Sequence, residues 1–351
     1  MVRYWKHGTF LLFLLLGLIA SLTQACGPDS GQQLVAAVES GDTATAVALI
    51  EQGVPIDVRL AGSDTLMMVA TKRGNVDVVK ALLARGAPPN ERNFEGATAL
   101  SLAASAGHVE VAGALLEAGA EVDRSDVDGR TPLIRAAGSG STEVMTLLLE
   151  RGANLEASDN RSHTALMAAA TNGKADAVAL LLERGAKLET RDLDERTALI
   201  LAAQEGHAEA TRLLLEAGAD VKAVAGDRCS ALIHAAERGH LDVVKLLVDA
   251  KAPVDAKDPM DRTALMRAAE NGHVGVIEAL IQGDAEVNAV DKTMQTALFW
   301  AALRGHNECV KVLLDHRADT RATDKNGWTA LDWARSKGHS DTVALLAERA
   351  R

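Results

Sequence analysis

A glycine returns every 33 residues over most of the chain, and this spacing constrains the fold more than any other feature of the sequence. The glycines stand at positions 41, 74, 107, 140, 173, 206, 239, 272, 305 and 338, with no insertion or deletion between them. A fixed period of about 20–50 residues is typical of repeat proteins, in which each copy forms one supersecondary unit. The sequence therefore predicts ten copies of one unit.

Each copy predicts two short helices. In the fullest copy, Thr131 precedes an apolar run and fits a helix N-cap, and Pro132 suits the first helical position. The recurring glycine ends this helix because it tolerates the left-handed backbone of a helix C-terminus. A second helix follows with an apolar stripe and ends in a Gly-Ala pair such as Gly152-Ala153. A polar hairpin then leads to the next copy.

The core of this chain contains few aromatic residues. Four of the nine aromatics lie within the first 13 residues, and residues 26–351 hold only Phe94, Phe299, Trp300, Trp328 and Trp333. A core built instead from Ala, Leu and Val suits closely packed helices and disfavours a β-sandwich or barrel. One copy cannot bury its apolar face alone, so stability must come from stacking of neighbouring copies.

The 33-residue period, the recurring sequence pattern of each copy (the frame) and its constant alignment along the chain together resemble the ankyrin repeat from Gln32 to Arg351. The resemblance implies an all-α ankyrin solenoid of about ten 33-residue helix-turn-helix repeats with hairpin loops. The repeats are expected at residues 32–59, 60–92, 93–125, 126–158, 159–191, 192–224, 225–257, 258–290, 291–323 and 324–351. They form one predicted domain over residues 32–351.

Some copies depart from the frame. The first lacks the Thr-x-Leu pattern and the last stops at Arg351, as expected of caps whose outer face meets water. Lys251, Asp284 and Arg317 replace the glycine after the second helix, which predicts altered hairpin geometry there. The slot that commonly holds His in the family holds apolar residues here, so an apolar contact between repeats is expected at Ile134, Met167, Ile200, Ile233, Met266 and Phe299.

The N-terminus predicts export. Arg3 and Lys6 precede an apolar stretch over residues 10–20, which is typical of a signal peptide and short for a membrane span. The segment ends in Ala25-Cys26 and resembles a bacterial lipoprotein signal, which implies cleavage after residue 25 and lipid on the Cys26 sulfur. Gly27 implies passage to the outer membrane in that family, and residues 26–31 are expected to form a short tether. Ordinary cleavage that leaves Cys26 as a thiol is the alternative.

The charge of the chain argues against nucleic-acid binding. It carries 37 basic and 48 acidic residues and a formal net charge of −11. Residues 1–25 hold two basic residues and no acidic one, so the remaining 326 carry −13. Non-specific nucleic-acid binding needs a basic surface. Contact with a membrane is expected only through the N-terminal anchor.

No pattern of catalytic, cofactor or metal-binding residues stands apart from the repeat. Histidines follow the recurring glycine at positions 108, 207, 240, 273, 306 and 339. Stacked copies place such residues about 8–10 Å apart, too far for one zinc ion, so structural roles are expected. Cys229, His234 and His240 share one repeat but different parts of its frame, which disfavours a zinc site. Cys229 and Cys309 lie too far apart for a disulfide. We predict no enzyme, cofactor or metal.

The residues that vary within the frame predict a protein-binding surface. Ankyrin proteins bind ligands through hairpin tips and first helices, and Arg and Trp are enriched in interface hot spots. The residues predicted to contact a partner protein are Arg228, His234, Met260, Arg262, Arg267, Met294, Trp300, Arg304, Trp328 and Trp333. Alternatively, Trp300 and Trp333 seal the C-terminal cap and the arginines pair with acids in adjacent hairpins.

These observations together favour a protein-binding scaffold or adaptor in a bacterial cell envelope. Its expected location is the periplasmic face of the outer membrane, and its partner is a protein that the sequence does not identify. Two alternatives stay open: a secreted ankyrin effector that binds a protein of another cell, and a periplasmic thiol- or metal-handling protein.

Overall fold

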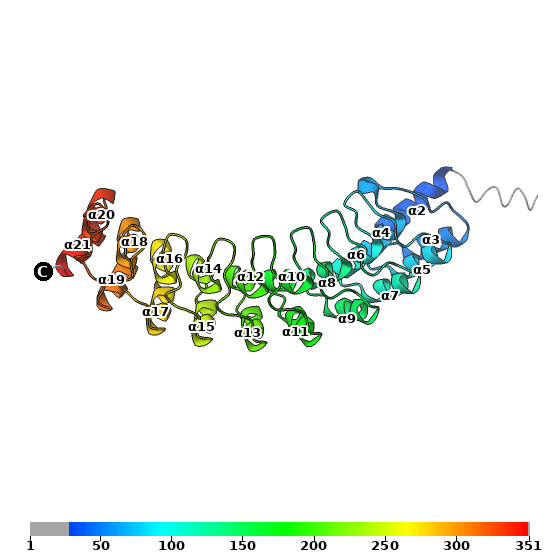
Figure 1. Cartoon of the computed structure of the whole chain (residues 1–351). Helices are drawn as coiled ribbons and strands as arrows, with labels where there is room; N and C mark the ends of the chain where they lie inside the picture. The colour runs from blue at the N-terminus through cyan, green and yellow to red at the C-terminus, as the bar shows by residue number, and fades with distance from the viewer. Residues whose placement is uncertain (1–27, 350–351) are drawn as a thin grey trace, which may run out of the picture. The chain divides into compact units, whose positions relative to one another are not determined.

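The computed structural model describes residues 28–349 of the chain. Within that range the regular elements are α-helices, one short 3-10 helix and two isolated β-bridges, with no strand (Figure 1). The predicted all-α class is confirmed. Among the same residues, no helix has both the length and the apolar character needed to cross a membrane. The predicted signal peptide and Cys26 lie outside the described residues.

The chain packs as two compact units, the first ending at Asp159 and the second beginning at Asn160. The 33-residue spacing continues across this boundary, so the sequence, which predicted one domain, gives no sign of it. The first unit contains helices α2 (Pro28–Ser40), α3 (Thr43–Glu51), η1 (Ala61–Ser63), α4 (Leu66–Lys72), α5 (Val76–Ala84), α6 (Ala99–Ala106), α7 (Val109–Glu117), α8 (Pro132–Ser139) and α9 (Thr142–Glu150).

The second unit contains six helix pairs. Its first helices are α10 (Ala165–Thr171), α12 (Ala198–Gln204), α14 (Ala231–Arg238), α16 (Ala264–Asn271), α18 (Ala297–Arg304) and α20 (Ala330–Lys337). Its second helices are α11 (Ala175–Glu183), α13 (Ala208–Glu216), α15 (Leu241–Asp249), α17 (Val274–Gln282), α19 (Asn307–Asp315) and α21 (Ser340–Arg349). Within this unit the first helices form one row and the second helices another, and the hairpin loops extend past the first helices (Figure 1).

Local sequence explains where the first helices begin and end. The Thr263 hydroxyl accepts a hydrogen bond from the backbone N–H of Met266 and so caps α16. Gly272, with φ of +80°, then ends the helix in the left-handed conformation. Leu265 and Met266 are almost fully buried between neighbouring repeats. The apolar slot predicted from the sequence is buried in the same way in the other copies, and Phe299 at that slot is 2% exposed.

The recurring histidines connect each repeat to the one before it. Nε2 of five of them lies 2.9–3.1 Å from a carbonyl oxygen of the preceding first helix, in the pairs His207–Thr171, His240–Gln204, His273–Glu237, His306–Glu270 and His339–Leu303. A carbonyl oxygen can only accept, so Nε2 carries the proton in each pair. The predicted structural role is confirmed at these five positions.

Two expectations about the chain path differ from the structure. Helix α2 begins at Pro28, so residues 28–31, expected in the tether, form the start of the first helix. Lys251, Asp284 and Arg317 have φ of 62°, 66° and 65°, the same left-handed conformation that Gly152 and Gly185 adopt in their repeats. The prediction of altered hairpin geometry was therefore wrong, because these residues accept the strained backbone and keep the frame.

Candidate protein-binding site

All ten residues predicted to contact a partner lie in the second unit, on hairpins or on the face of the first helices that follows them. The exposed members are Arg228, Met260, Met294, Arg304 and Trp328. The partly buried members are His234, Arg262, Arg267, Trp300 and Trp333. The partly buried side chains are held by contacts within the protein, so their role differs from that of the exposed side chains.

A buried aspartate, five residues before the N-cap, shapes the hairpins of this region. Asp258 Oδ1 accepts backbone N–H bonds from Met260 at 2.7 Å and from Arg262 at 2.9 Å. Asp291 and Asp324 make the same pair of bonds in the next two hairpins. These aspartates were not predicted as positioning residues, although their recurrence at a fixed distance before Thr could have revealed them.

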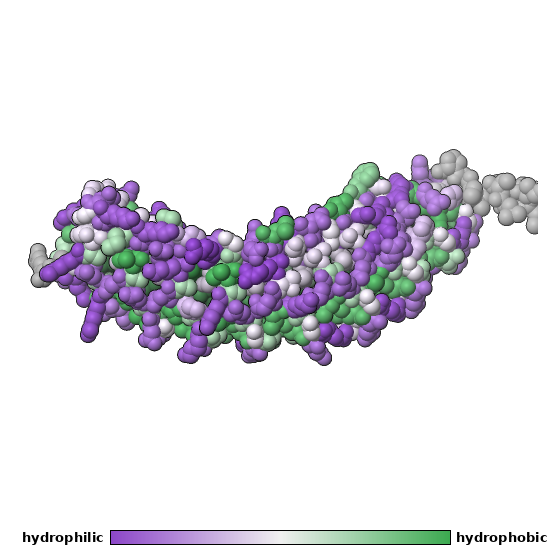
Figure 2. Space-filling view, viewed as in Figure 1, coloured by the Kyte–Doolittle hydropathy of each residue, from purple (hydrophilic) through white to green (hydrophobic). Residues whose placement is uncertain are grey.

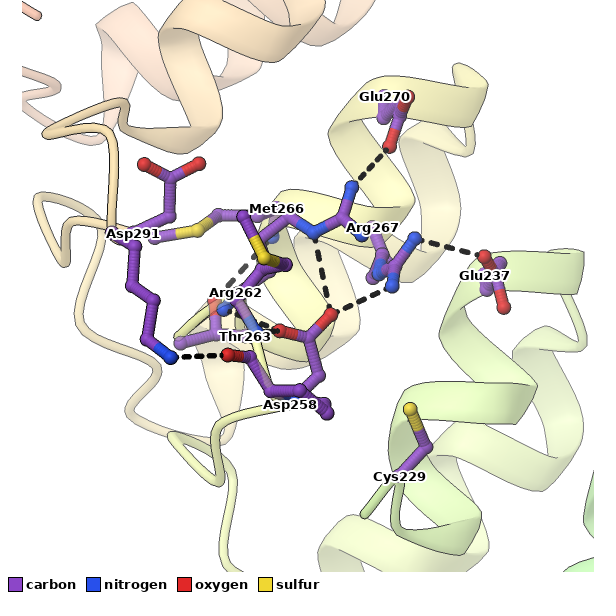
Figure 3. Close-up of polar contacts among 12 residues, drawn as sticks. Cys229, Glu237, Asp258, Arg262, Thr263, Met266, Arg267, Glu270 and Asp291 are labelled. Carbon is purple, nitrogen blue, oxygen red and sulfur yellow. Dashed lines mark hydrogen bonds and ion pairs between the residues drawn. The ribbon is translucent and has the colours of Figure 1, made fainter. Parts of the chain in front are cut away.

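The second oxygen of Asp258 holds two arginines (Figure 3). Asp258 Oδ2 lies 3.3 Å from Arg262 Nε and 2.6 Å from Arg267 Nη2. Arg267 also pairs with Glu237 at 3.1 Å, and Arg262 with Glu270 at 3.4 Å. Burial alone would raise the pKa of Asp258, but hydrogen bonds from the Arg262 backbone and the Arg267 side chain lower it below its usual value. Both guanidinium groups are thus neutralised inside the protein.

The tryptophans of the last two repeats are anchored in the same way. Trp300 Nε1 donates to Asp291 Oδ2 at 3.3 Å, and Trp333 Nε1 donates to Asp324 Oδ2 at 3.0 Å. The ring of Trp328 lies 5.1 Å from that of Trp333, centroid to centroid, with an interplanar angle of 54°. The structural alternative predicted arginine pairs with acids of adjacent hairpins, whereas Arg262 and Arg267 pair with Asp258 of the same repeat and with Glu270 and Glu237 on first helices.

An open cavity of about 440 Å³ lies between the hairpins of the last three repeats. The Arg262 guanidinium stands 5.6 Å from the centre of the Trp300 ring at this place. Its lining combines thioether, indole, amide and charged groups from Met260, Arg262, Asp291, Thr293, Gln295, Trp300, Asp324, Lys325 and Asn326. A mixed lining of this kind can take both an apolar side chain and backbone polar groups of a partner.

Exposed apolar side chains also stand on hairpins outside the predicted set. Phe94 is 80% exposed, Val127 59% and Leu193 70%, compared with 46% for Met260 and 42% for Trp328. Figure 2 shows small apolar patches along the edge where the hairpin loops lie, among largely hydrophilic residues. These side chains were not among the predicted contacts, because the aromatic residues cluster in the last repeats and favoured those repeats as the binding surface.

The hairpin of repeat 225–257 differs from the others. Asp227 Oδ1 accepts the backbone N–H of Cys229 at 2.8 Å, and Asp227 Oδ2 lies 3.6 Å from His234 Nε2. Ligand atoms of Asp227, Cys229 and His234 all lie within 4.8 Å of one another. Burial, with the charge of Asp227, raises the pKa of Cys229 to about 12, and burial lowers that of His234. His240, the third candidate ligand in the sequence, is instead bonded to the Gln204 carbonyl, and Asp227 stands beside Cys229 and His234.

The second thiol stands apart. Cys309 is buried on α19, and burial raises its pKa to about 11. Cys229 and Cys309 are both free, as the sequence predicted from their separation. Neither carries the lowered pKa of a reactive thiolate.

Comparison with known proteins places this geometry in a family. The sequence family described as ankyrin repeats (3 copies) matches residues 34–126, 67–159, 123–192, 155–225, 199–291 and 265–351. The chain belongs to the ankyrin-repeat family. Ankyrin repeats generally mediate protein–protein interaction and are typically non-enzymatic.

A solved structure shows the same fold. The crystal structure of the human ASB11 ankyrin repeat domain matches with a TM-score of 0.58 and 27% sequence identity, covering 63% of this chain and 98% of that chain. A comparison with curated protein sequences finds no significant match.

Proposed function

We propose that this ankyrin-repeat protein is a scaffold or adaptor in a bacterial cell envelope. A lipid on Cys26 would hold it at the membrane, and the hairpins and first helices of its last repeats would bind a partner protein. The observation that carries the proposal is a set of exposed apolar side chains, Met260, Met294 and Trp328, on aspartate-braced hairpins beside an open cavity.

The exposure of these side chains favours binding over a packing role. Met260 and Met294 are 46% and 47% exposed, and Trp328 is 42% exposed. Met and Trp are enriched at protein interfaces, where each buries apolar surface against a partner. Contact with a partner would remove this surface from water and contribute affinity that the free protein does not use.

The braced residues support recognition in a different way. Arg262, Arg267 and Trp300 are already bonded to Asp258, Glu237 and Asp291 and would keep these positions when a partner binds. Rigid side chains lose little conformational entropy on binding, so the site is preorganised. Replacing them would disturb the hairpins, which makes them poor choices for a test of binding alone.

The test replaces the exposed residues with those that other repeats carry at the same places in the frame. Met260→Thr follows Thr293, Met294→Ser follows Ser162, and Trp328→Gln follows Gln295. We expect the triple variant to keep its helical melting curve and to lose, in cross-linking and affinity capture from native envelopes, a protein that the original chain captures.

A matched control changes exposed apolar residues elsewhere. Phe94→Asn and Val127→Asn take the residue that Asn160 provides at the same place in another repeat. This control is expected to retain the captured protein. Retention of that protein by a folded triple variant would refute the proposed site, and its loss in the control as well would show that capture depends on general surface hydrophobicity.

A further inference from the structure

One repeat breaks the rule that connects hairpins to first helices. Four other repeats carry a side chain with an N–H donor four residues after the N-cap. Each of these repeats also carries an aspartate five residues before the N-cap, and the aspartate Oδ2 bonds to that side chain. This pairing holds Arg135 to Asp126, Arg267 to Asp258, Trp300 to Asp291 and Trp333 to Asp324. Repeat 225–257 has Ala225 where the aspartate would stand, and a histidine, His234, on the helix.

His234 is therefore a polar side chain whose usual partner is missing. Its side chain is only 12% exposed, and its Nε2 atom is buried without a hydrogen-bond partner. A buried polar atom left unpaired costs about 1–3 kcal/mol. The nearest carboxylate oxygen, Asp227 Oδ2, lies at 3.6 Å, beyond hydrogen-bond distance.

The groups around this nitrogen are of the kinds that coordinate metal ions. Cys229 precedes the N-cap Ser230, Asp227 lies two residues earlier, and His234 projects from α14. Their ligand atoms lie within 4.8 Å of one another. Tetrahedral zinc with bonds of about 2.0–2.3 Å separates its ligands by about 3.3–3.8 Å. The His234–Asp227 distance of 3.6 Å already meets this value, and Cys229 Sγ lies within 4.8 Å of both other ligand atoms.

The hairpin prepares Asp227 for this role. Its Oδ1 is engaged by the Cys229 backbone N–H at 2.8 Å, which leaves Oδ2 turned toward His234. A carboxylate oriented through its second oxygen is a common arrangement around a metal ion. The Asp227 side chain is 56% exposed, so an ion can enter from solvent and keep a water molecule as a further ligand.

We propose that Asp227, Cys229 and His234 bind one zinc ion, with a water molecule in the fourth position. As the Zn–S bond forms, the Cys229 thiol releases its proton to solvent. Thiolate and imidazole ligands select zinc over calcium or magnesium, which prefer oxygen ligands. This site goes beyond the proposed adaptor function, and its metal binding can be measured without any partner protein.

The test uses the full chain with Cys26→Ser, so that Cys229 and Cys309 are its two thiols. Metal-free protein is equilibrated with Zn²⁺ and its metal content measured, and Co²⁺ serves as a spectroscopic probe. We expect one Zn²⁺ per chain, a thiolate-to-cobalt charge-transfer band, and a melting temperature that rises with Zn²⁺ concentration.

Three variants and one control separate a metal site from a chance cluster. Cys229→Ser and His234→Leu are expected to weaken Zn²⁺ binding by about 100-fold or more, and Asp227→Asn by about tenfold. Leucine is a fold-preserving choice, since Leu201 occupies the same place in the preceding repeat. Cys309→Ser is expected to bind Zn²⁺ as the parent does.

Two results would overturn the proposal. One is a parent chain that takes up no Zn²⁺ at micromolar concentration or shows no thiolate band with Co²⁺. The other is a His234→Leu variant that binds Zn²⁺ as tightly as the parent while folded, because the ion would then sit elsewhere.

Discussion

The aspartate five residues before the N-cap performs two tasks with one carboxylate. Asp192 Oδ1 accepts the backbone N–H groups of Asp194 and Arg196, and its Oδ2 contacts Arg196 Nε at 2.9 Å and His163 Nε2 at 3.1 Å. The first task shapes the hairpin, and the second fixes one side chain of the same hairpin and one of the preceding hairpin. Asn93 occupies the equivalent place in its own repeat and accepts two backbone bonds there, so an amide can perform the first task.

Asp192 predicts a pH dependence of stability. Burial alone would raise its pKa, but hydrogen bonds from Arg196 and His163 and the Arg196 charge lower it below the ordinary 3.8. A group whose pKa is depressed by folding stabilises the protein above its unfolded pKa, and this contribution is lost as the pH falls through the folded pKa. We expect the melting temperature to fall as the pH decreases below about 5.

Asp192→Asn isolates that contribution. The variant should keep the hairpin, lose about 1–3 kcal/mol near neutral pH because a charge-assisted bond is removed, and show a shallower loss of stability in acid. Urea unfolding at a series of pH values measures both effects. An acid profile as steep as that of the parent would show that other carboxylates control it.

At the scale of the helix, the repeat is predictable and its exceptions are not. Thr263 and Gly272 mark the ends of α16 by capping chemistry that operates within a few residues, so the sequence alone identified them. The proximity of Asp227 to His234 depends on how a hairpin folds over the next helix and on the absence of an aspartate at Ala225. The left-handed Lys251 was missed for another reason: a residue other than glycine is uncommon at positive φ, so its place in the sequence pattern suggested a change of backbone that does not occur.

The recurring glycines predict unequal costs of substitution. A Cβ atom on Gly239 would lie 2.6 Å from His273 Nδ1, whereas one on Gly338 would meet nothing within 4 Å. Both residues have positive φ, 79° and 76°, so alanine strains the backbone at both by about 1–3 kcal/mol. Gly239→Ala must also displace His273 from the Glu237 carbonyl, which adds about 1 kcal/mol or more.

Chemical denaturation of the two alanine variants tests this difference. We expect Gly239→Ala to be clearly less stable than Gly338→Ala, and the additional replacement His273→Ala to reduce the gap between them. Equal losses of stability would mean that the histidine moves aside without cost, and that the glycine serves only the backbone turn.

At the scale of the molecule, the fold and the net charge were within reach of the sequence, and the partner was not. Ten copies from residue 32 on carry the same sequence pattern, so one atypical residue does not change the predicted fold. The proposed binding surface uses positions that vary between copies, such as Met260 and Trp328, and the repeated pattern does not determine which residues stand there. Their exposure shows where contact is possible, while the chemistry of the partner lies outside the chain.

The proposed anchor makes a prediction for the whole molecule. Only Gly27 separates Cys26 from Pro28, where α2 begins, and an extended residue spans at most about 3.6 Å. A lipid on Cys26 would thus hold the first repeat next to the bilayer and keep a bound partner at the membrane, which raises its local concentration. Expressed in a bacterium supplied with radiolabelled fatty acid, the parent chain and Cys229→Ser should incorporate label and sediment with membranes, whereas Cys26→Ser should do neither. Because α2 starts after Cys26, the helical melting curve should be unchanged in Cys26→Ser.

A parent chain that is exported and cleaved but carries no label would instead support the freely secreted alternative, in which the same surface meets its partner in solution.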